Sequence, residues 1–544
     1  MAVTTAKPEV FSRKTSGLVR VMSPWSAFIY NFLAMGIIFP WIYVEAPVLF
    51  PGVSVWMACL IGMLIELPIA LAYVWVASAM PRSGGDYVFQ SRVLGGAAAF
   101  PIVLSGIVFW QALGLALLGW QFALLGLSPL FMGLGVHYND AGLINAAVWV
   151  QSQTGIVVIS LVVSGLMALL TISGLKNFVR VQYFMFLFTA IFIVVMIAQF
   201  LRTSPASFAT AMNHFSAVAN NNPNYYTWLQ HDVSSTGYDL LPKFAIGATL
   251  LAAPIAWMST QWATYSVEQG GEIKGGRVFN NQLFMLVGSL IAVGIIMAVI
   301  AWSEQRAVGT AFFHAASASF YGGITQSGNG VGNVLPFPAT LAIVISPNPI
   351  IVVLVCLGIM MCAMQMFCNI FIGATRIMVG MSLDRVLPTW VSKVNGRTRT
   401  PVNAHIVYWI IGVIMILGWN YVGFWSKMTL GIIFAPGYVF MFSALASALL
   451  PYRAKALYEA SPGAHIKIAG IPVVTIVGLI GFVFALGVEI AFLVNPKYGL
   501  TGTASYVFLA GVFIASVVGY WIGRQYQKGK GIDLSYAFHE VPPE

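Results

Sequence analysis

Long runs of apolar residues, separated by short polar segments, follow one another along almost the whole chain. Each run has about 20 residues or more, which is the length an α-helix needs to cross the hydrocarbon core of a bilayer. The runs are continuous, whereas the strands of a membrane barrel alternate apolar and polar positions. Because a backbone in lipid must satisfy its own hydrogen bonds, the pattern predicts an all-α polytopic membrane protein. Twelve transmembrane helices are expected, over residues 24–45, 53–79, 98–126, 153–173, 177–201, 243–267, 279–302, 348–379, 402–421, 427–450, 468–493 and 502–524.

The composition also indicates that lipid is the main solvent of the folded chain. Of the 544 residues, 59% are hydrophobic and only 8% are charged, and the mean hydropathy is +0.86. A soluble domain typically carries about 25% charged residues, and a soluble core of this size could not hide so much apolar surface. The sequence therefore predicts that the lipid bilayer is a partner of this chain.

The basic residues predict the orientation of the helices. With the N-terminus placed inside, 21 of the 26 Lys and Arg residues fall in inside segments and 5 in outside segments. Basic loops of membrane proteins stay in the cytoplasm. We therefore expect a multi-pass plasma-membrane protein with cytoplasmic tails at 1–23 and 525–544 and an extracellular loop at 202–242. The basic residues are scattered over short segments, so the net charge of +10 does not indicate nucleic acid binding.

Residues that support catalysis or metal binding are sparse. Of the seven histidines, only His405 falls inside an expected span, and the chain contains neither H-E-x-x-H nor G-x-S-x-G. An active site would need converging His, Asp, Glu or Cys residues. The four cysteines lie inside apolar runs without the paired spacing of metal ligands. We therefore expect no enzyme activity, no metal and no cofactor.

Three motifs in segments expected to be cytoplasmic carry a family resemblance. Residues 80–87 are M-P-R-S-G-G-D-Y, and residues 272–277 are E-I-K-G-G-R. Residues 376–388 fit R-x-x-x-x-M-x-x-D-x-x-L-P, and T-P-V follows at 400–402. In this order the motifs resemble those of amino acid permeases of the amino acid–polyamine–organocation superfamily, and the resemblance extends over about residues 20–540.

The resemblance implies the leucine-transporter fold and a transport function. In that fold, residues 24–201 and 243–450 would form two inverted repeats of five helices, and residues 451–524 would add two helices. The implied function is secondary active transport of an amino acid or related amine by alternating access. Relatives use a sodium ion, a proton or exchange of a second solute as the energy source, and a proton is expected here. Exchange of two solutes and a transport-inactive nutrient receptor are the alternatives. A channel is disfavoured because no ring-forming charge pattern is present.

Charged residues of the three motifs are candidates for a cytoplasmic gate. An Arg at the C-terminus of a helix suits the helix dipole, and a nearby carboxylate can pair with a cation. A solvated loop explains the same charges equally well. The candidates are Arg82, Asp86, Glu272, Arg376 and Asp384.

The first expected helix contains a candidate break. Gly36 lowers the helix propensity, and Pro40 removes the hydrogen bond to residue 36. The resemblance implies that Ala34, Met35 and Gly36 bind the substrate through their main chain, although the family has a glycine-richer run here. An ordinary proline-kinked helix is the alternative.

The sixth expected helix carries a polar run that is costly at the middle of a membrane unless it faces protein or water. Its candidates for substrate binding are Trp257, Ser259, Thr260, Gln261 and Trp262. The two tryptophans could instead be packing residues. Polar groups on helices that should face the same pocket add Gln111, Gln365 and Asn369.

The remaining polar residues indicate which ion could drive transport. The eighth expected helix has no Ser or Thr between Ser346 and Thr375, which argues against the oxygen ligands that sodium prefers. Some proton-coupled relatives have a Lys in helix 5, and the matching position here is Thr189. Glu66 lies mid-helix, where a charge costs about 3 kcal/mol. Glu66 is our candidate for proton coupling. The alternative is that Glu66 is neutral and only forms a structural hydrogen bond between helices. Glu489, which lies outside the repeats, is a weaker candidate for proton coupling.

Overall fold

The computed structural model describes residues 16–37, 39–346, 348–423, 431–538 and 540–541. Within them, ten helices are long and apolar enough to cross a membrane, and the chain is a polytopic all-α protein. These helices are α3 (Val55–Ala79), α5 to α7 (Gly96–Tyr138), α9 (Gln153–Ile172), α10 (Leu175–Arg202), α14 to α15 (Phe279–Val308), α18 (Pro349–Leu383), α19 (Val402–Tyr421), α21 (Gly431–Arg453), α23 (Val473–Val494) and α24 (Thr503–Gly529).

Two of these long helices contain wider, π-helical turns. The first consists of α5 (Gly96–Val103), η2 (Leu104–Phe109), α6 (Trp110–Gln121), η3 (Phe122–Leu127) and α7 (Ser128–Tyr138). The second consists of α14 (Phe279–Gln282), η6 (Leu283–Gly288) and α15 (Ser289–Val308). π-Bulges occur frequently near functional sites.

The two other expected spans, residues 24–45 and 243–267, are interrupted and do not form long helices. The first consists of α1 (Pro24–Ala34), a stretch without helix at 35–37, and η1 (Trp41–Glu45), a π-helix that leads into α2 (Ala46–Leu49). The second consists of α13 (Ile246–Thr260) and η4 (Gln261–Glu268), a 3₁₀-helix that is followed by η5 (Gly270–Glu272). The count of twelve spans therefore stays a prediction.

The interruption of α1 falls at the expected place. The helix begins at Pro24, where the side chain of Ser23 accepts a hydrogen bond from the N–H of Ser26 at 3.0 Å. It ends at Ala34, because Met35 has an extended backbone with φ −69° and ψ 142°. The N–H of Gly36 then donates to a carbonyl outside the helix and no longer to a preceding turn.

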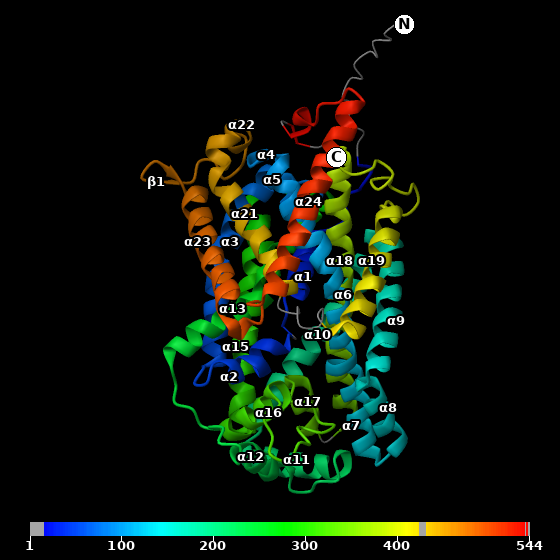
Figure 1. Cartoon of the computed structure of the whole chain (residues 1–544), viewed down its shortest axis with the longest axis vertical. Helices are drawn as coiled ribbons and strands as arrows, with labels where there is room; N and C mark the ends of the chain where they lie inside the picture. The colour runs from blue at the N-terminus through cyan, green and yellow to red at the C-terminus, as the bar shows by residue number, and fades with distance from the viewer. Residues whose placement is uncertain (1–15, 38, 347, 424–430, 539, 542–544) are drawn as a thin grey trace, which may run out of the picture.

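The remaining elements gather at the two ends of the bundle, as Figure 1 shows. One end, here called the terminal end, carries the first and the last described residues and short elements of the motifs at 80–87 and 272–277. The opposite end, here called the loop end, is covered by short helices that lie outside the twelve expected spans. At the terminal end lie α4 (Gly85–Val93), α22 (Lys455–Glu459), the antiparallel pair β1 (Lys467–Ile468) and β2 (Ile471–Pro472), and η8 (Leu534–Phe538). At the loop end lie α8 (Ala141–Gln151), α11 (Pro205–Ala219), α12 (Tyr225–Ser234), α16 (Thr310–Gly322), α17 (Pro338–Val344) and η7 (Pro496–Tyr498).

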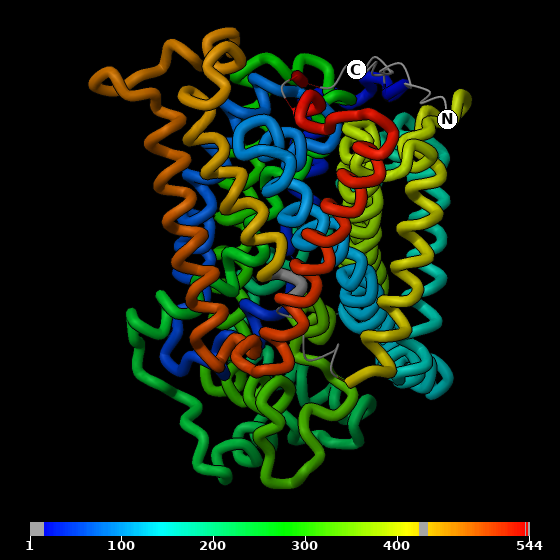
Figure 2. The backbone as a smooth tube through the Cα atoms, turned by 45° about the horizontal axis from the view of Figure 1, so that its top comes forward, coloured from blue at the N-terminus to red at the C-terminus, as the bar shows by residue number. Residues whose placement is uncertain are grey.

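Helix α3 crosses the bundle between α13 and α23, and the three helices run side by side in both views (Figures 1 and 2). Two glycines allow this close packing. A Cβ on Gly62 would lie 2.7 Å from the backbone nitrogen of Trp257 on α13, and a Cβ on Gly481 of α23 would lie 3.1 Å from the backbone nitrogen of Ile69. Larger residues at these positions would push the helices apart, so α3 is held in contact with both neighbours.

Candidate functional site

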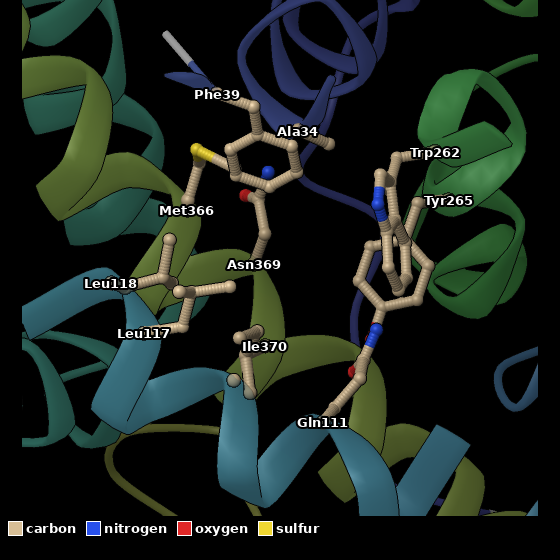
Figure 3. Close-up of a pocket in the computed structure, with 11 residues that line it drawn as sticks. Ala34, Phe39, Gln111, Leu117, Leu118, Trp262, Tyr265, Met366, Asn369 and Ile370 are labelled. Atoms are coloured by element: carbon tan, nitrogen blue, oxygen red, sulfur yellow. The ribbon is translucent and has the colours of Figure 1, made fainter. Parts of the chain in front are cut away.

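A small cavity lies where the interrupted α1 meets α6, α18 and η4. Its volume is about 50 Å³. Figure 3 shows Trp262 and Tyr265 on one side of it and Met366 and Leu118 on the other. The lining residues are Ala34, Phe39, Gln111, Gly114, Leu117, Leu118, Trp262, Tyr265, Met366, Asn369 and Ile370.

The structure separates the residues expected at this site into two groups. Ala34, Gln111, Trp262 and Asn369 line the cavity. The others are buried behind its wall and do not line it: Met35, Gly36, Trp257, Ser259, Thr260, Gln261 and Gln365.

A main-chain hydrogen bond joins the two interrupted segments. The N–H of Gly36 donates to the carbonyl oxygen of Ser259 at 3.0 Å. The N–H of Ile37 turns back to Met35 at 2.8 Å, so neither amide reaches the carbonyl four residues earlier in α1. The carbonyls of Phe32 and Leu33 thus lack the helical partners they would have in a continuous helix. These carbonyl dipoles carry partial negative charge at the end of α1.

Amide side chains fix α1 against α10 and α18 beneath the cavity. Gln365 donates to the Oδ1 of Asn369 at 2.8 Å and to the Oε1 of Gln182 at 3.3 Å. Asn369 donates to the carbonyl of Tyr30 at 3.2 Å, and the hydroxyl of Tyr30 donates to the carbonyl of Asn369 at 3.1 Å. Gln182 in turn donates to the carbonyl of Ser26 at 2.8 Å. These bonds hold the side chain of Asn369 at the cavity wall.

The polar residues of α13 mostly serve its own backbone and its contact with α3. Thr260 donates to the carbonyls of Trp257 at 3.2 Å and of Gly62 at 3.4 Å. Gln261 donates to the carbonyl of Met258 at 3.4 Å. The indole of Trp257 is fully buried and donates to Glu66 at 2.8 Å. Trp257 is thus a buried partner of Glu66 and does not stack over the cavity, whereas Trp262 borders it.

Tyr265 is a cavity residue that the sequence did not single out. Its hydroxyl donates to the Oε1 of Gln111 at 2.6 Å, and its ring lies 5.4 Å from Trp262 in an edge-on arrangement. Residues three apart eclipse each other in a 3₁₀-helix, so Trp262 and Tyr265 of η4 share one face. The candidates chosen from the sequence ended at Trp262, three residues before Tyr265.

Aromatic rings close the cavity toward both ends of the bundle. Toward the loop end, Phe39 contacts Trp41 at 5.8 Å, Trp41 contacts Trp120 at 6.0 Å, and Trp120 contacts Phe337 at 5.9 Å between ring centroids. Toward the terminal end, Tyr30 stacks on Tyr265 at 6.3 Å.

Beyond Tyr265, the terminal end is fastened by two buried ion pairs. Arg376 binds both carboxylate oxygens of Glu272, at 2.8 and 3.1 Å. Arg92, which the sequence did not place in the gate, binds both oxygens of Asp384, at 2.6 and 2.9 Å. The side chains of all four residues are at most 1% exposed. Such charges are stable in a dry interior only because their geometry is bidentate.

The other two gate candidates have different surroundings. Asp86 accepts hydrogen bonds from Tyr73 at 2.5 Å and Ser443 at 2.6 Å, and its N–H donates to Glu268 at 3.3 Å. Burial raises the pKa of both Asp86 and the adjacent Glu268. Arg82 donates to the carbonyl of Pro81 at 3.1 Å. Glu268, which lies at the end of η4, was missed because its neighbour Asp86 comes from a distant segment.

The coupling candidates lie away from the cavity. Glu66 is fully buried on α3 against Trp257. Thr189 on α10 donates to the carbonyl of Gly358 at 3.2 Å. Gly358 packs tightly there, since a Cβ on it would lie 2.2 Å from the Cβ of Phe192. The four cysteines are buried, and within the described residues no group of His, Cys, Asp or Glu could hold a metal ion.

Comparison with known proteins places this geometry in a family. The family model described as amino acid permease matches residues 22–518. Curated protein sequences give no match. The matched range contains both interrupted segments, the cavity and the ion pairs of the terminal end.

Proposed function

The chain belongs to the amino acid permease family, and from this premise we propose that it is a secondary active transporter that moves an amino acid or related amine by alternating access. The family consists of transporters and not of enzymes. We further propose twelve spans, with 24–201 and 243–450 as inverted repeats and 451–524 as appended helices. The interruptions support this arrangement, because each falls in the first span of its repeat.

The observation that carries the proposal is the cavity at the interrupted α1. Ala34 and Phe39, which flank the interruption, both line it. The end of α1 offers free carbonyl dipoles that attract an ammonium group, and the start of η1 at Trp41 offers positive dipole ends that attract a carboxylate. A small zwitterion therefore matches the site without needing a charged side chain.

The size of the cavity favours a small substrate. One water needs about 10–15 Å³ of such space, so about 50 Å³ accommodates a handful of non-hydrogen atoms. Glycine and alanine are of this size, and larger amino acids require that Phe39 or Trp262 move.

The terminal end is the proposed cytoplasmic side, because the basic residues concentrate there. In the plasma membrane, the loop at 202–242 would then be extracellular. The pairs Arg376–Glu272 and Arg92–Asp384 would be the cytoplasmic gate, joined by Asp86 and Arg82, and would hold the inward path shut. Opening toward the cytoplasm then requires that water replace these partners.

Proton symport is the proposed energy source. Glu66 is a fully buried carboxyl that touches helix α13 through Trp257, and the position of Thr189 supplies no cation. A proton on Glu66 would weaken its hold on Trp257 and so act on an interrupted helix. Amino acid exchange remains the rival mechanism, and a transport-inactive receptor would bind without moving its ligand.

Transport by purified protein in liposomes tests the proposal. Radiolabelled glycine and alanine should enter saturably, faster with an inward proton gradient, and should exchange in counterflow. Counterflow without stimulation by the gradient would identify an exchanger. Ligand-induced thermal stabilisation without uptake would identify a receptor, and neither binding nor uptake of any amino acid would refute the proposal.

The Gly36→Ala variant links transport to this cavity. A Cβ on Gly36 would lie 2.1 Å from the ring of Phe39, which must shift against the cavity wall. Overpacking of this kind costs typically 1–3 kcal/mol, so we expect glycine uptake to fall by roughly tenfold or more. Gly487→Ala on α23 is the matched control, because nothing lies within 4 Å of its added methyl group. Equal uptake by both variants would separate transport from this cavity.

A further inference from the structure

Two buried carboxyl groups approach the same indole ring from different helices. Glu66 of α3 accepts the N–H of Trp257 at 2.8 Å. On the other edge of the ring, a Cβ on Gly437 of α21 would lie 3.0 Å from Cη2 of Trp257 and 2.1 Å from Oε1 of Glu489 on α23. The missing side chain at Gly437 is therefore what lets the Glu489 carboxyl reach the benzene edge of Trp257. Glu489 lies outside the repeats in sequence but next to α13 in space.

Neither carboxyl has enough partners to remain charged in a dry interior. Glu66 is fully buried and Glu489 is 4% exposed. Among the described residues, no hydrogen bond reaches Oε1 of Glu66 or either oxygen of Glu489. An unpaired charge in such surroundings is strongly disfavoured, and a carboxyl normally escapes the cost by taking up a proton. Both groups are therefore suited to hold protons.

We propose that Glu66 and Glu489 form a two-carboxyl proton-binding site around Trp257, with Glu489 as a second coupling residue. This inference rests on the proposed transport function. Each carboxyl binds one proton and becomes a neutral acid. When a proton leaves, the new carboxylate strengthens its attraction for the positive edge of the indole, so the charge of the pair sets the position of Trp257 between α3 and α21.

Helix α21 offers a physical connection from this site to the substrate cavity. Gly437 borders Trp257 and Glu489, and Phe440, which lies almost one turn further along, contacts Trp262 at 5.6 Å between ring centroids. Trp262 is a wall of the cavity. A shift of α21 against Trp257 therefore moves a ring that contacts the cavity wall.

Few other titratable groups face the pair. Asp86 acts electrostatically on Glu66, and Glu489 acts electrostatically on Tyr438 of α21. Tyr438 is engaged with Ser105 at 2.5 Å. Glu304 on α15, which also packs against α3, is buried without a hydrogen-bond partner among the described residues. It is the matched control, since it has the same chemistry but forms no hydrogen bond with Trp257 within the described part of the chain.

Infrared difference spectroscopy of the full-length protein in liposomes tests proton binding without transport. A protonated carboxyl absorbs above the amide I band. Glu66→Gln and Glu489→Gln should each remove one pH-dependent component, and each should alter the titration of the other because interacting groups titrate as a pair. Glu304→Gln should leave both components unchanged. The proposal is wrong if Glu489→Gln removes no carboxyl absorption. It is also wrong if the titration of the Glu489 component is the same in Glu66→Gln as in the wild type.

Glycine uptake then tests coupling. Glu489→Gln should lose the stimulation by an inward proton gradient, while counterflow remains measurable. Trp257→Phe, which replaces the indole with a smaller phenyl ring that has no N–H, should reduce the mutual effect of the two carboxyls and serves as the second variant if Glu489→Gln does not fold. Gradient stimulation that persists in Glu489→Gln overturns its coupling role. If the wild type transports no amino acid, the transport proposal fails while the spectroscopic result still decides whether the proton site exists.

Discussion

The two ends of the helix bundle are closed by different kinds of interaction. At the terminal end, Arg376–Glu272 and Arg92–Asp384 are bidentate ion pairs that are almost completely buried. The C-terminal residues add to this closure, because the carbonyls of Ala537 and Glu540 accept further hydrogen bonds from Arg92 at 3.2 and 3.1 Å. Charge therefore holds the terminal end together.

At the loop end, stacked rings and hydrogen bonds to carbonyl and carboxylate oxygens take the place of ion pairs among the described residues, and the cations Arg306 and Lys497 donate there to backbone carbonyls. Tyr226 of α12 stacks on Phe312 of α16, with ring centroids 4.7 Å apart and planes 7° from parallel. Tyr225 donates to the carbonyl of Val331 at 2.8 Å, and Tyr321 donates to Glu45 at 2.5 Å. These contacts tie the covering helices to each other and to η1.

The difference between the ends indicates how each can open. Buried ions lose their hydration when the terminal end closes and regain it when water enters, so the net cost of opening is smaller than the strength of the pairs suggests. Apolar rings gain nothing from water, and the loop end can open only if its helices move as packed units. The contrast predicts that single substitutions have larger effects at the terminal end.

The largest effect is expected from breaking one ion pair on one side only. Glu272→Gln leaves the guanidinium of Arg376 buried without a counter-charge, and such a change costs about 3–5 kcal/mol. The free energy of unfolding in detergent micelles, from denaturant titration, measures it. Replacing both partners, by Arg376→Met with Glu272→Leu, should recover most of the loss. A loss below about 1 kcal/mol in the single variant would remove the contrast between the ends.

The next effect concerns pH and the loop end. The ring of His314 on α16 is 3% exposed, and burial lowers its pKa to about 4, although Asp239 opposes the shift. The unfolded chain, with a pKa of about 6.5, binds more protons than the folded chain between these values. Stability from this residue is therefore present above pH 6.5 and is lost as the pH falls toward 4.

His314→Leu removes this titration. The variant should unfold like the wild type at pH 7.5 and should be more stable by roughly 3 kcal/mol at pH 4, since one pKa unit corresponds to about 1.4 kcal/mol. The same substitution at His137, whose ring is exposed, controls for the loss of a histidine. If the difference in free energy of unfolding between variant and wild type is the same at pH 7.5 and pH 4, the proposed titration of His314 is wrong.

The helices were predictable because a long, continuous apolar run in lipid satisfies its backbone hydrogen bonds by forming an α-helix. Residues 153–173 and 402–421 became Gln153–Ile172 and Val402–Tyr421 almost without change. The break near Gly36 was also predictable, because glycine and proline act locally. The helices α11 and α12 were not predicted, because their sequences mix polar and aromatic residues and lack a long apolar run.

The site was only partly predictable for a different reason. A sequence shows that Trp257 and Trp262 share a span and, being five residues apart, point to different sides of a helix, but it does not show which of the two lines the cavity. The bond between Trp257 and Glu66 joins residues 191 positions apart, and the packing at Gly437 places Glu489 beside them. Contacts between distant segments leave no local pattern.

A smaller effect is expected from a neutral hydrogen bond at the loop end. Tyr321→Phe removes the donor to Oε1 of Glu45, whose other oxygen has no hydrogen-bond partner among the described residues. The loss of one such bond costs about 1–2 kcal/mol, less than half of the value expected for Glu272→Gln. Tyr536→Phe, at an exposed tyrosine of η8, is the control. A cost that equals that of Glu272→Gln would mean that the two ends are fastened equally.

The smallest effect is expected at the terminal end itself and shows that burial, not charge alone, makes its ion pairs strong. Lys455 and Glu459 of α22 lie 3.7 Å apart, but their side chains are 74% and 61% exposed. Water screens such a pair, so Glu459→Gln should change the free energy of unfolding by no more than about 0.5 kcal/mol. The substitution matches Glu272→Gln in chemistry and differs in solvent access. A loss at Glu459 comparable with that at Glu272 would show that net charge, and not desolvation, stabilises this end.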